Sequence, residues 1–426
     1  MSASTPLGPL ALAALASSAV PGLDPQSVQE VRPRHDTNFE TARIEDTEHR
    51  RWVLRAPLTA AAGAQQEAAQ PLLRLVARRL PFAVPVARGF APVRDRGRAM
   101  VYPQPSGHPL DWAALPAGTA LAAEVGRAIA ALHNLDPRIY EEAGLPSYDA
   151  EEYRTRLLAE VDRGAATGRV PTGLLTRWEH ALEEVGLWRF GATPTHGNLL
   201  GEHVLADFPN EQDAGVGRVR AVTGWERAQV ADPADDFASL VSEADPEAFD
   251  TVYEAYAHAR IERPDQHLEH RARLAGELRL LTALLEAVAA DDSRLVDARS
   301  SALRRLEEQT EGEDLIPSSL ERPSGRITPV PLDAEADAGD DVDARDDAPH
   351  DPDTEDDLDT EDDVEGPGAV EGTEQDSGAE ADDRAEPAAT PPESTTEPHL
   401  SAGQASSPTT AEAPERANGT EAGRSS

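Results

Sequence analysis

Acidic residues are concentrated at one end of this chain, and this imbalance limits how much of the chain can fold. Residues 331–426 contain 30 Asp and Glu residues against four Arg residues, a net charge of −26 out of −40 for all 426 residues. From residue 311 onward Phe, Trp and Tyr are absent. Such a composition buries too little apolar surface to offset the entropy lost on folding. We therefore predict a disordered acidic tail over residues 311–426, after a folded part.

Cysteine and lysine are both absent, and each absence excludes a class of site. Without cysteine the chain has no disulfide, thiolate nucleophile or Cys-ligated zinc. All 39 basic residues are Arg, which excludes a P-loop lysine and Schiff-base chemistry. Catalysis at a conventional lysine is therefore excluded.

Residues 1–27 are predicted to contain an N-terminal helix. The apolar stretch 7–23 is not preceded by Lys or Arg and contains Pro9 and Pro21. These features favour a helix packed on the folded part over a signal peptide. No other segment reaches the length of a membrane span. We therefore expect a cytoplasmic protein that has no membrane partner.

Residues 28–103 are predicted to form a small, β-rich N-lobe. Within this range, β-branched and aromatic residues lie beside turn residues in five segments: QEVRP, NFETARIE, HRRWVLRAP, VPVARGFAPV and RAMVYPQP. Between the third and fourth segments, Leu72, Leu73, Val76 and Leu80 recur at helical spacing. This spacing predicts one helix over residues 61–80. Strands with an inserted helix indicate an α+β lobe.

Residues 104–310 are predicted to form a mostly helical C-lobe. In segment 118–134, Leu121, Val125, Ile129 and Leu132 fall on one helical stripe. Further amphipathic helices are expected over residues 148–163, 172–188, 247–262, 266–291 and 293–310. Two apolar runs in the middle of the lobe, HVLAD and RVRAVTGW, are typical of a pair of short strands.

Five short motifs carry a resemblance to a known family. THGNLLGEHVL (195–205) resembles the catalytic loop H-G-D-L-H-x-x-N-x-L of the aminoglycoside and macrolide phosphotransferases. TGWERA (223–228) is similar to the I-D-W-E-x-A of that family, and ADPADDFA (231–238) to its G-D-P-x-x-D-L-A. Upstream, GRAIAALH (126–133) resembles the G-R-x-L-A-x-L-H helix, and RWVLR (51–55) the strand with the ATP-contacting basic residue. The order and spacing of these motifs fit over residues 30–310.

The resemblance implies a two-lobed, protein-kinase-like fold that moves a γ-phosphate from ATP or GTP to a hydroxyl with the help of magnesium. By the same resemblance, Arg55 contacts the nucleotide phosphates and Glu67 pairs with Arg55. Met100 and Tyr102 lie in the hinge between the lobes, where backbone groups of the family bind the purine. The resemblance leaves the true cofactor of this chain open.

Three positions depart from the family pattern where the chemistry is done. Asn198 replaces the Asp that accepts the hydroxyl proton, and a neutral amide cannot act as a general base. His203 replaces the Asn that binds magnesium, a metal that prefers oxygen ligands. Gly224 replaces the main magnesium carboxylate and offers no side-chain ligand. The segment before the second strand, residues 33–39, also lacks a glycine for a phosphate cradle.

Other motif residues are predicted to be structural. His196 is expected to be a satisfied buried residue, like Trp225 beside its motif. Asp232 precedes a proline and is expected to cap a helix, and Asp236 to hydrogen-bond near the loop. His133 ends a predicted helix, and a role at that C-terminus explains it. Three further carboxylates are interpreted as surface groups, although a relocated site that uses the first or the last is conceivable: Glu202, Asp207 and Glu226.

Three hypotheses about function follow. The first is a pseudokinase, a catalytically dead or impaired family member that binds a nucleotide or another small molecule or acts as a scaffold. The second is an active small-molecule phosphotransferase with rearranged metal ligands. The third is an interaction protein whose acidic tail captures a basic protein. Nucleic acid is not an expected partner, because the chain has no basic surface to set against phosphate.

Overall fold

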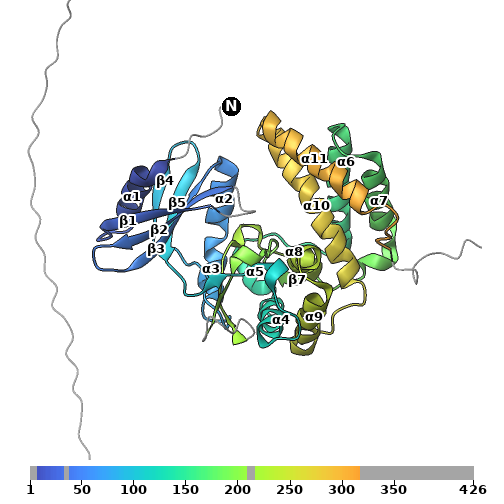
Figure 1. Cartoon of the computed structure of the whole chain (residues 1–426), viewed down its shortest axis with the longest axis horizontal. Coiled ribbons are helices and arrows are strands. Elements are labelled where there is room, and N and C mark those ends of the chain that lie inside the picture. The colour runs from blue at the N-terminus through green and yellow to red at the C-terminus, as the bar shows by residue number, and fades with distance from the viewer. Residues whose placement is uncertain (1–6, 33–37, 209–215, 317–426) are drawn as a thin grey trace, which may run out of the picture. The chain divides into compact units, whose positions relative to one another are not determined.

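The computed structural model describes residues 7–32, 38–208 and 216–316. Most of the predicted acidic tail, residues 317–426, lies outside the described residues, as does most of the glycine-free segment before the second strand. The described chain forms the two lobes expected from the sequence, a β-sheet lobe followed by a helical lobe (Figure 1). The α+β class and the kinase-like arrangement are thereby confirmed.

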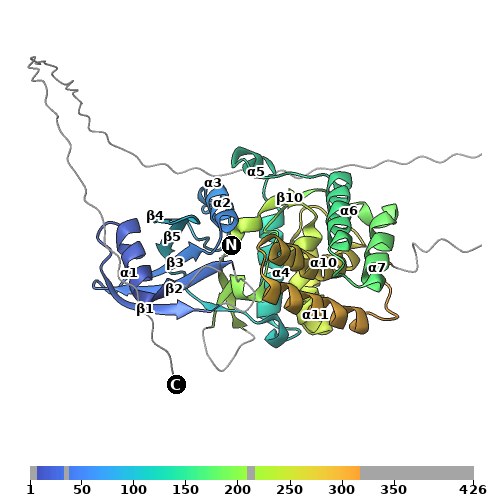
Figure 2. The ribbon, with the colours of Figure 1, turned by 90° about the horizontal axis from the view of Figure 1, so that it is seen from above.

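The N-lobe is built on an antiparallel sheet with the strand order β1-β2-β3-β5-β4. The strands are β1 (Pro25–Val31), β2 (Phe39–Asp46), β3 (Arg51–Pro57), β4 (Gly89–Val93) and β5 (Gly97–Pro103). Helix α1 (Gly8–Ala19) lies on one face of this sheet (Figure 2). Leu12 and Ala16 of α1 are buried there against Ile44 and Leu54. The N-terminal helix therefore packs on the domain, as predicted.

The single helix predicted over residues 61–80 is wrong. Two helices occupy this range, α2 (Ala60–Ala68) and α3 (Gln70–Val76), and the second has Pro71 in its first turn. A proline lacks the N–H that would continue the preceding helix, and it is tolerated at a helix start. Leu72, Leu73 and Val76 of α3 are buried in the main core cluster of the C-lobe. Helix α3 therefore fixes one lobe to the other.

The C-lobe contains eight α-helices in the described residues, which are α4 (Ala120–His133), α5 (Arg138–Glu142), α6 (Ala150–Ala166), α7 (Thr172–Glu183), α8 (Ala238–Glu243), α9 (Pro246–Ala259), α10 (Leu268–Ala289) and α11 (Ser293–Gln309). The predicted strand pair is present as β8 (Val204–Asp207) and β9 (Arg218–Val222), which pair antiparallel. Strand β6 (His108–Pro109) extends this sheet. Strands β7 (Thr193–Thr195) and β10 (Gln229–Ala231), which were not predicted, pair with each other.

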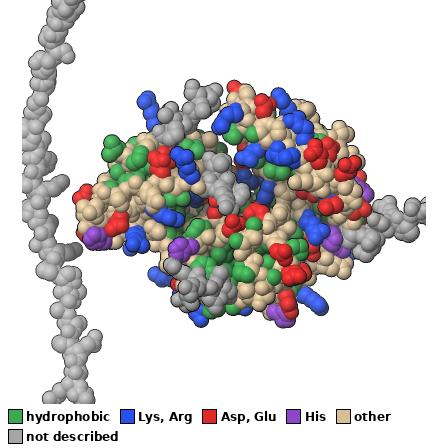
Figure 3. All heavy atoms as spheres, viewed as in Figure 1, with side chains coloured by type: hydrophobic (Ala, Val, Ile, Leu, Met, Phe, Trp, Pro, Cys, Tyr) green, Lys and Arg blue, Asp and Glu red, His purple; other side chains and the backbone are tan. Residues whose placement is uncertain are grey.

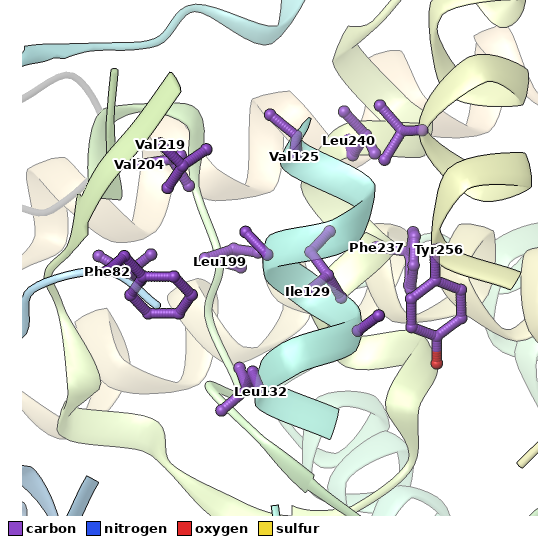
Figure 4. Close-up of a cluster of buried hydrophobic side chains, with 14 of the residues drawn as sticks. Phe82, Val125, Ile129, Leu132, Leu199, Val204, Val219, Phe237, Leu240 and Tyr256 are labelled. Carbon is purple, nitrogen blue, oxygen red and sulfur yellow. The ribbon is translucent and has the colours of Figure 1, made fainter. Parts of the chain in front are cut away.

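The main core of the C-lobe surrounds α4 (Figure 4). The predicted stripe of Leu121, Val125, Ile129 and Leu132 is buried there. Gly126 explains how closely α4 approaches α9, because a Cβ at this position would lie 2.2 Å from the carbonyl oxygen of Val252. Any larger residue would push the two helices apart.

A second cluster joins α6, α7, α10 and α11, and it corrects the predicted start of the tail. Leu315 and Ile316 are buried in this cluster beside Leu174 and Leu303. Arg177 of α7 donates a hydrogen bond to the carbonyl oxygen of Glu313. Residues 311–316 therefore belong to the C-lobe, because two apolar side chains and one arginine hold the segment in place. Composition missed this, because both side chains lie within an acidic run.

No helix among the described residues is long and apolar enough to cross a membrane. The face drawn in Figure 3 shows basic and acidic side chains interspersed over both lobes. The cytoplasmic location stays a prediction.

The buried pair Leu315 and Ile316 leads to a stability prediction. Replacing both with alanine in the full chain should lower the free energy of unfolding by about 4 kcal/mol, because each truncation leaves a cavity in a packed cluster. Urea unfolding measures the change. The control, Leu10→Ala on α1, removes a side chain that is 88% exposed and should cost less than about 0.5 kcal/mol. Equal stability of the two variants would contradict the assignment of residues 311–316 to the C-lobe.

Candidate active site between the lobes

The loop that follows β7 is held in place by one buried carboxylate. Asp236, in the 3₁₀ helix η6 (Pro233–Phe237), accepts hydrogen bonds from the backbone N–H groups of His196 and Gly197, both at 2.8 Å. Burial raises the pKa of this carboxyl, but the hydrogen bonds from His133 and from the backbone N–H of His196 lower the pKa by more than burial raises it. The net pKa lies below its ordinary value, and Asp236 is ionised. The hydrogen bond near the loop that the sequence predicted is therefore present.

His133 is part of the same network, and its predicted role at a helix end is wrong. Its side chain is fully buried, with Nε2 3.0 Å from Asp236 Oδ2 and Nδ1 2.9 Å from the hydroxyl of Tyr256. A carboxylate only accepts, so Nε2 carries the proton and Nδ1 accepts from Tyr256. Burial lowers the pKa of His133. The imidazole therefore links α4 to η6 and α9 and supplies no cation to the end of α4.

His196 lies at the base of the loop as a satisfied buried residue. Its Nε2–H donates to the carbonyl oxygen of Thr223 at 2.7 Å, and its ring packs edge-on against Trp225 with 5.0 Å between ring centroids. Burial, and next the neighbouring His203, lower the pKa of His196 to about 4. The ring is therefore neutral at pH 7 and holds the loop against the segment that follows β9.

His203 and Gly224, the two positions that bind magnesium in the family pattern, contact each other. His203, in η3 (Gly201–His203), is buried, and its Nδ1–H donates to the backbone oxygen of Asn198 at 2.9 Å. Gly224 has the positive φ of 83°. A Cβ built on Gly224 would lie 2.5 Å from both Cε1 and Nε2 of His203. The imidazole therefore fills the space in which a side chain at residue 224 would begin.

This arrangement does not fit a magnesium ion. The ring occupies the position of one carboxylate, and imidazole nitrogen is a poor ligand for a metal that prefers oxygen. No group of three or more His, Asp and Glu side chains in residues 7–32, 38–208 and 216–316 is placed to hold a metal. Asn198 offers a neutral amide at the position of the base. We therefore derive no chemical step through a metal.

Arg55 is present in the cleft, but its predicted partner is wrong. Arg55 Nη1 donates to Glu226 Oε1, from the 3₁₀ helix η5 (Trp225–Arg227), and the guanidinium lies 4.0 Å from the ring centroid of Phe39. Glu67 of α2 pairs with Arg98 of β5, 2.8 Å from Nη2 to Oε2. The interpretation of Glu226 as a surface carboxylate is also wrong, because its side chain is only 12% exposed.

A cleft of about 370 Å³ lies between the lobes beside these residues. The N-lobe contributes Arg43, Val53 and Tyr102 to its walls, and the C-lobe contributes Trp112 and His203. Tyr102, one predicted hinge residue, therefore faces the cleft. Met100, the other, is buried, and its sulfur lies 2.9 Å from Nε2 of Gln70. Purine binding at this hinge stays a prediction.

The remaining motif carboxylates lie behind the loop. Asp232 caps η6 by accepting from the backbone N–H of Ala234 at 2.9 Å, as predicted, and it also pairs with the buried Arg271 at 2.7 Å. Asp235 accepts from the hydroxyl of Tyr153 at 2.7 Å. Burial, and next the charge of Asp232, raise the pKa of Asp235 to about 7. Neither Arg271 nor Tyr153 could be predicted from the sequence, because both lie far from the motifs along the chain.

The comparison with known families now decides the assignment. Residues 30–276, more than half of the chain, match the family model described as phosphotransferase enzyme family. The chain belongs to this family. A curated relative, the uncharacterized protein YcbJ of Bacillus subtilis (strain 168), is 32% identical over 111 residues, which are 26% of this chain and 33% of that protein. The match thus spans about a third of the length of that relative.

Solved structures of family enzymes share the fold. The macrolide 2'-phosphotransferase MphH from Brachybacterium faecium, solved as the apoenzyme, has a TM-score of 0.55 at 24% identity, over 66% of this chain and 94% of that chain. A macrolide 2'-phosphotransferase type I reaches 0.57 at 25% identity, over 71% and 99%. The GDP complex of aminoglycoside 2'-phosphotransferase-IIIa reaches 0.59 at 17% identity, over 71% and 99%. The predicted family and fold are confirmed.

The two adjacent carboxylates of η6 should respond in opposite ways to amidation. Asp236→Asn turns an amide N–H toward backbone donors and should cost about 3 kcal/mol. Asp235→Asn should be nearly neutral near pH 4 and stabilising at pH 8. Because the pKa of Asp235 rises from 3.8 to about 7 on folding, the native state binds the extra proton. The wild type should therefore lose stability relative to Asp235→Asn as pH rises from about 4 through 7.

Urea unfolding at several pH values between 5 and 8 measures this difference. Each variant serves as the matched control of the other, because both replace a buried carboxylate of η6 with an amide. A stability difference between wild type and Asp235→Asn that does not change with pH would contradict the raised pKa.

The contact between His203 and Gly224 should appear as coupling between substitutions. Gly224→Asp alone should cost about 3 kcal/mol, because its Cβ meets the imidazole. His203→Asn alone should cost about 1–2 kcal/mol through a small cavity and a lost hydrogen bond. In the double variant the clash is gone, so its cost should be at least about 1 kcal/mol below the sum. Additive costs in urea unfolding would show that the two residues do not exclude each other.

Proposed function

We propose that this protein is a pseudokinase of the phosphotransferase family, a binding protein that does not transfer phosphate, and that it acts in the cytoplasm. The observation that carries the proposal is the imidazole of His203 against Gly224. It leaves no room for the carboxylate that would hold a metal. Asn198 at the position of the proton acceptor supports the same conclusion.

The expected loss of rate is large because separate contributions are removed together. A positioned acid–base group is typically worth about 10²–10⁴-fold. Phosphoryl transfer depends mostly on electrostatic stabilisation of the transferring group, and metal ions supply much of it. The positioning network of Asp236, His133 and His196 remains in place. The protein therefore keeps the shape of the site without its chemical groups.

Ligand binding is the activity that the remaining cleft supports best. A fold neighbour, aminoglycoside 2'-phosphotransferase-IIIa, was solved with GDP. We propose that the cleft of this chain binds a small molecule, and that metal does not strengthen the binding. A role for the acidic tail with a basic protein is a separate hypothesis about residues outside those described.

Thermal unfolding of the full chain with ATP or GTP, with and without magnesium or manganese, tests the proposal. We expect no metal-dependent increase in the melting temperature of the wild type. The variant that restores the family side chains, Asn198→Asp with His203→Asn and Gly224→Asp, should gain a magnesium-dependent shift of a few degrees. The matched control is Asn198→Asp alone, which restores the base but leaves the imidazole in place, and it should gain none.

A second readout is release of ADP or GDP with an aminoglycoside or macrolide as acceptor. Magnesium-dependent binding by the wild type together with nucleotide turnover would replace this proposal with an active phosphotransferase whose metal ligands are rearranged.

A further inference from the structure

Arg55 pairs with a different carboxylate from the one that the family pattern predicts. Arg55 lies on β3, and its partner Glu226 lies 171 positions further along the chain, in the C-lobe. Glu67, the helix carboxylate that was expected to pair with Arg55, pairs with Arg98 instead. The guanidinium of Arg98 lies 4.6 Å from the ring centroid of Phe90. The Arg55–Glu226 ion pair therefore bridges the two lobes, whereas the Glu67–Arg98 pair stays within the N-lobe.

The bridge is shielded from water. The side chain of Arg55 is 5% exposed and that of Glu226 is 12% exposed. Phe39 covers the guanidinium from one side. Between groups this buried, the Coulombic attraction is much stronger than on a surface, and removing one partner leaves the other charge buried and unpaired. A ligand cannot use Arg55 without first competing with this carboxylate.

The N-lobe wall around Arg55 carries further groups that can bind anions. In the antiparallel register of β2 and β3, Thr41 is opposite Arg55 and Arg43 is opposite Val53. All four side chains line the cleft, as does Arg32 at the end of β1. Three arginines and a hydroxyl thus face one space, where guanidinium groups can bind phosphate oxygens in a bidentate manner without a metal. The opposite wall of the cleft carries the carboxylates Asp111, Glu202 and Glu243.

We propose that Glu226 is a built-in substitute for a phosphate group. Its carboxylate occupies the anion site at Arg55, and a phosphate-bearing ligand binds there, independently of metal, only by displacing it. The inference rests on the proposed loss of the metal site, because with magnesium present the phosphates would approach through the ion. Glu226 then sets the affinity of the cleft for polyphosphate and holds the lobes together while the site is empty.

Isothermal titration of the full chain with inorganic tripolyphosphate, in EDTA and separately in magnesium, tests this proposal. Glu226→Gln should bind tripolyphosphate in EDTA at least about tenfold more tightly than the wild type, because the competing charge is gone. The matched control is Glu277→Gln, which removes the carboxylate of another buried ion pair, the one with Arg177, at a residue that does not line the cleft. It should bind as the wild type does.

Two more variants keep the test decisive. The double variant Arg55→Gln with Glu226→Gln should lose the gain, because the anion site itself is removed. Glu226→Asp keeps the charge but shortens the reach, and it should bind with intermediate affinity even if the Gln variant folds poorly.

Equal affinity of Glu226→Gln, Glu226→Asp and wild type in EDTA would overturn the inference. So would an equal gain in Glu277→Gln, since that result would reflect the net charge of the protein. A gain confined to the magnesium titration would overturn both the inference and the proposed loss of the metal site. If the wild type bound tightly in magnesium while Glu226→Gln still bound more tightly than the wild type in EDTA, only the proposed loss of the metal site would be overturned.

Discussion

The structure around the cleft depends on the hydrogen bonds to one buried carboxylate. Asp236 binds two successive backbone N–H groups of the loop after β7, and His133 binds it in turn from α4. A buried ion without these donors would cost far more than the fold can offset. The loop, α4 and η6 can therefore reach their native positions only together. This explains why the positioning residues of the family are present although its reacting groups are not.

The substitutions in the loop are physically linked. An aspartate at residue 224 and the imidazole of His203 exclude each other. The histidine at 203 therefore requires a residue without a side chain at 224. The ring is held by the backbone oxygen of Asn198 and lies beside His196, 5.5 Å between ring centroids. A return to a metal-binding arrangement therefore requires at least two simultaneous replacements, since either one alone leaves a clash or a gap.

The sequence predicted what local patterns determine. The stripe of α4, the β8–β9 pair and the cap at Asp232 follow from local patterns. The contact of Asp236 with the loop, 40 positions away, followed from the family resemblance instead. Sequence prediction failed where a side chain chooses among distant partners. Arg55 pairs with Glu226 rather than with Glu67, and His133 binds Asp236 and Tyr256, more than a hundred positions away. Leu315 and Ile316 escaped notice because a window dominated by acidic residues hides two apolar side chains. The break between α2 and α3 is the exception, because Pro71 is a local signal for it.

The residues at the positions of the family's base and metal ligands show how a site can lose its metal without losing its fold. Carboxylates gathered to hold a cation repel one another when the cation is absent, so an enzyme with such a cluster carries a cost that binding relieves. Here Asn198 and Gly224 carry no charge, His203 donates to a backbone oxygen, and the carboxylate of Glu226 pairs with Arg55. Arg55 and Glu226 balance each other's charge without an ion. The two lobes are therefore joined through the same arginine that, in our proposal, would otherwise hold a phosphate.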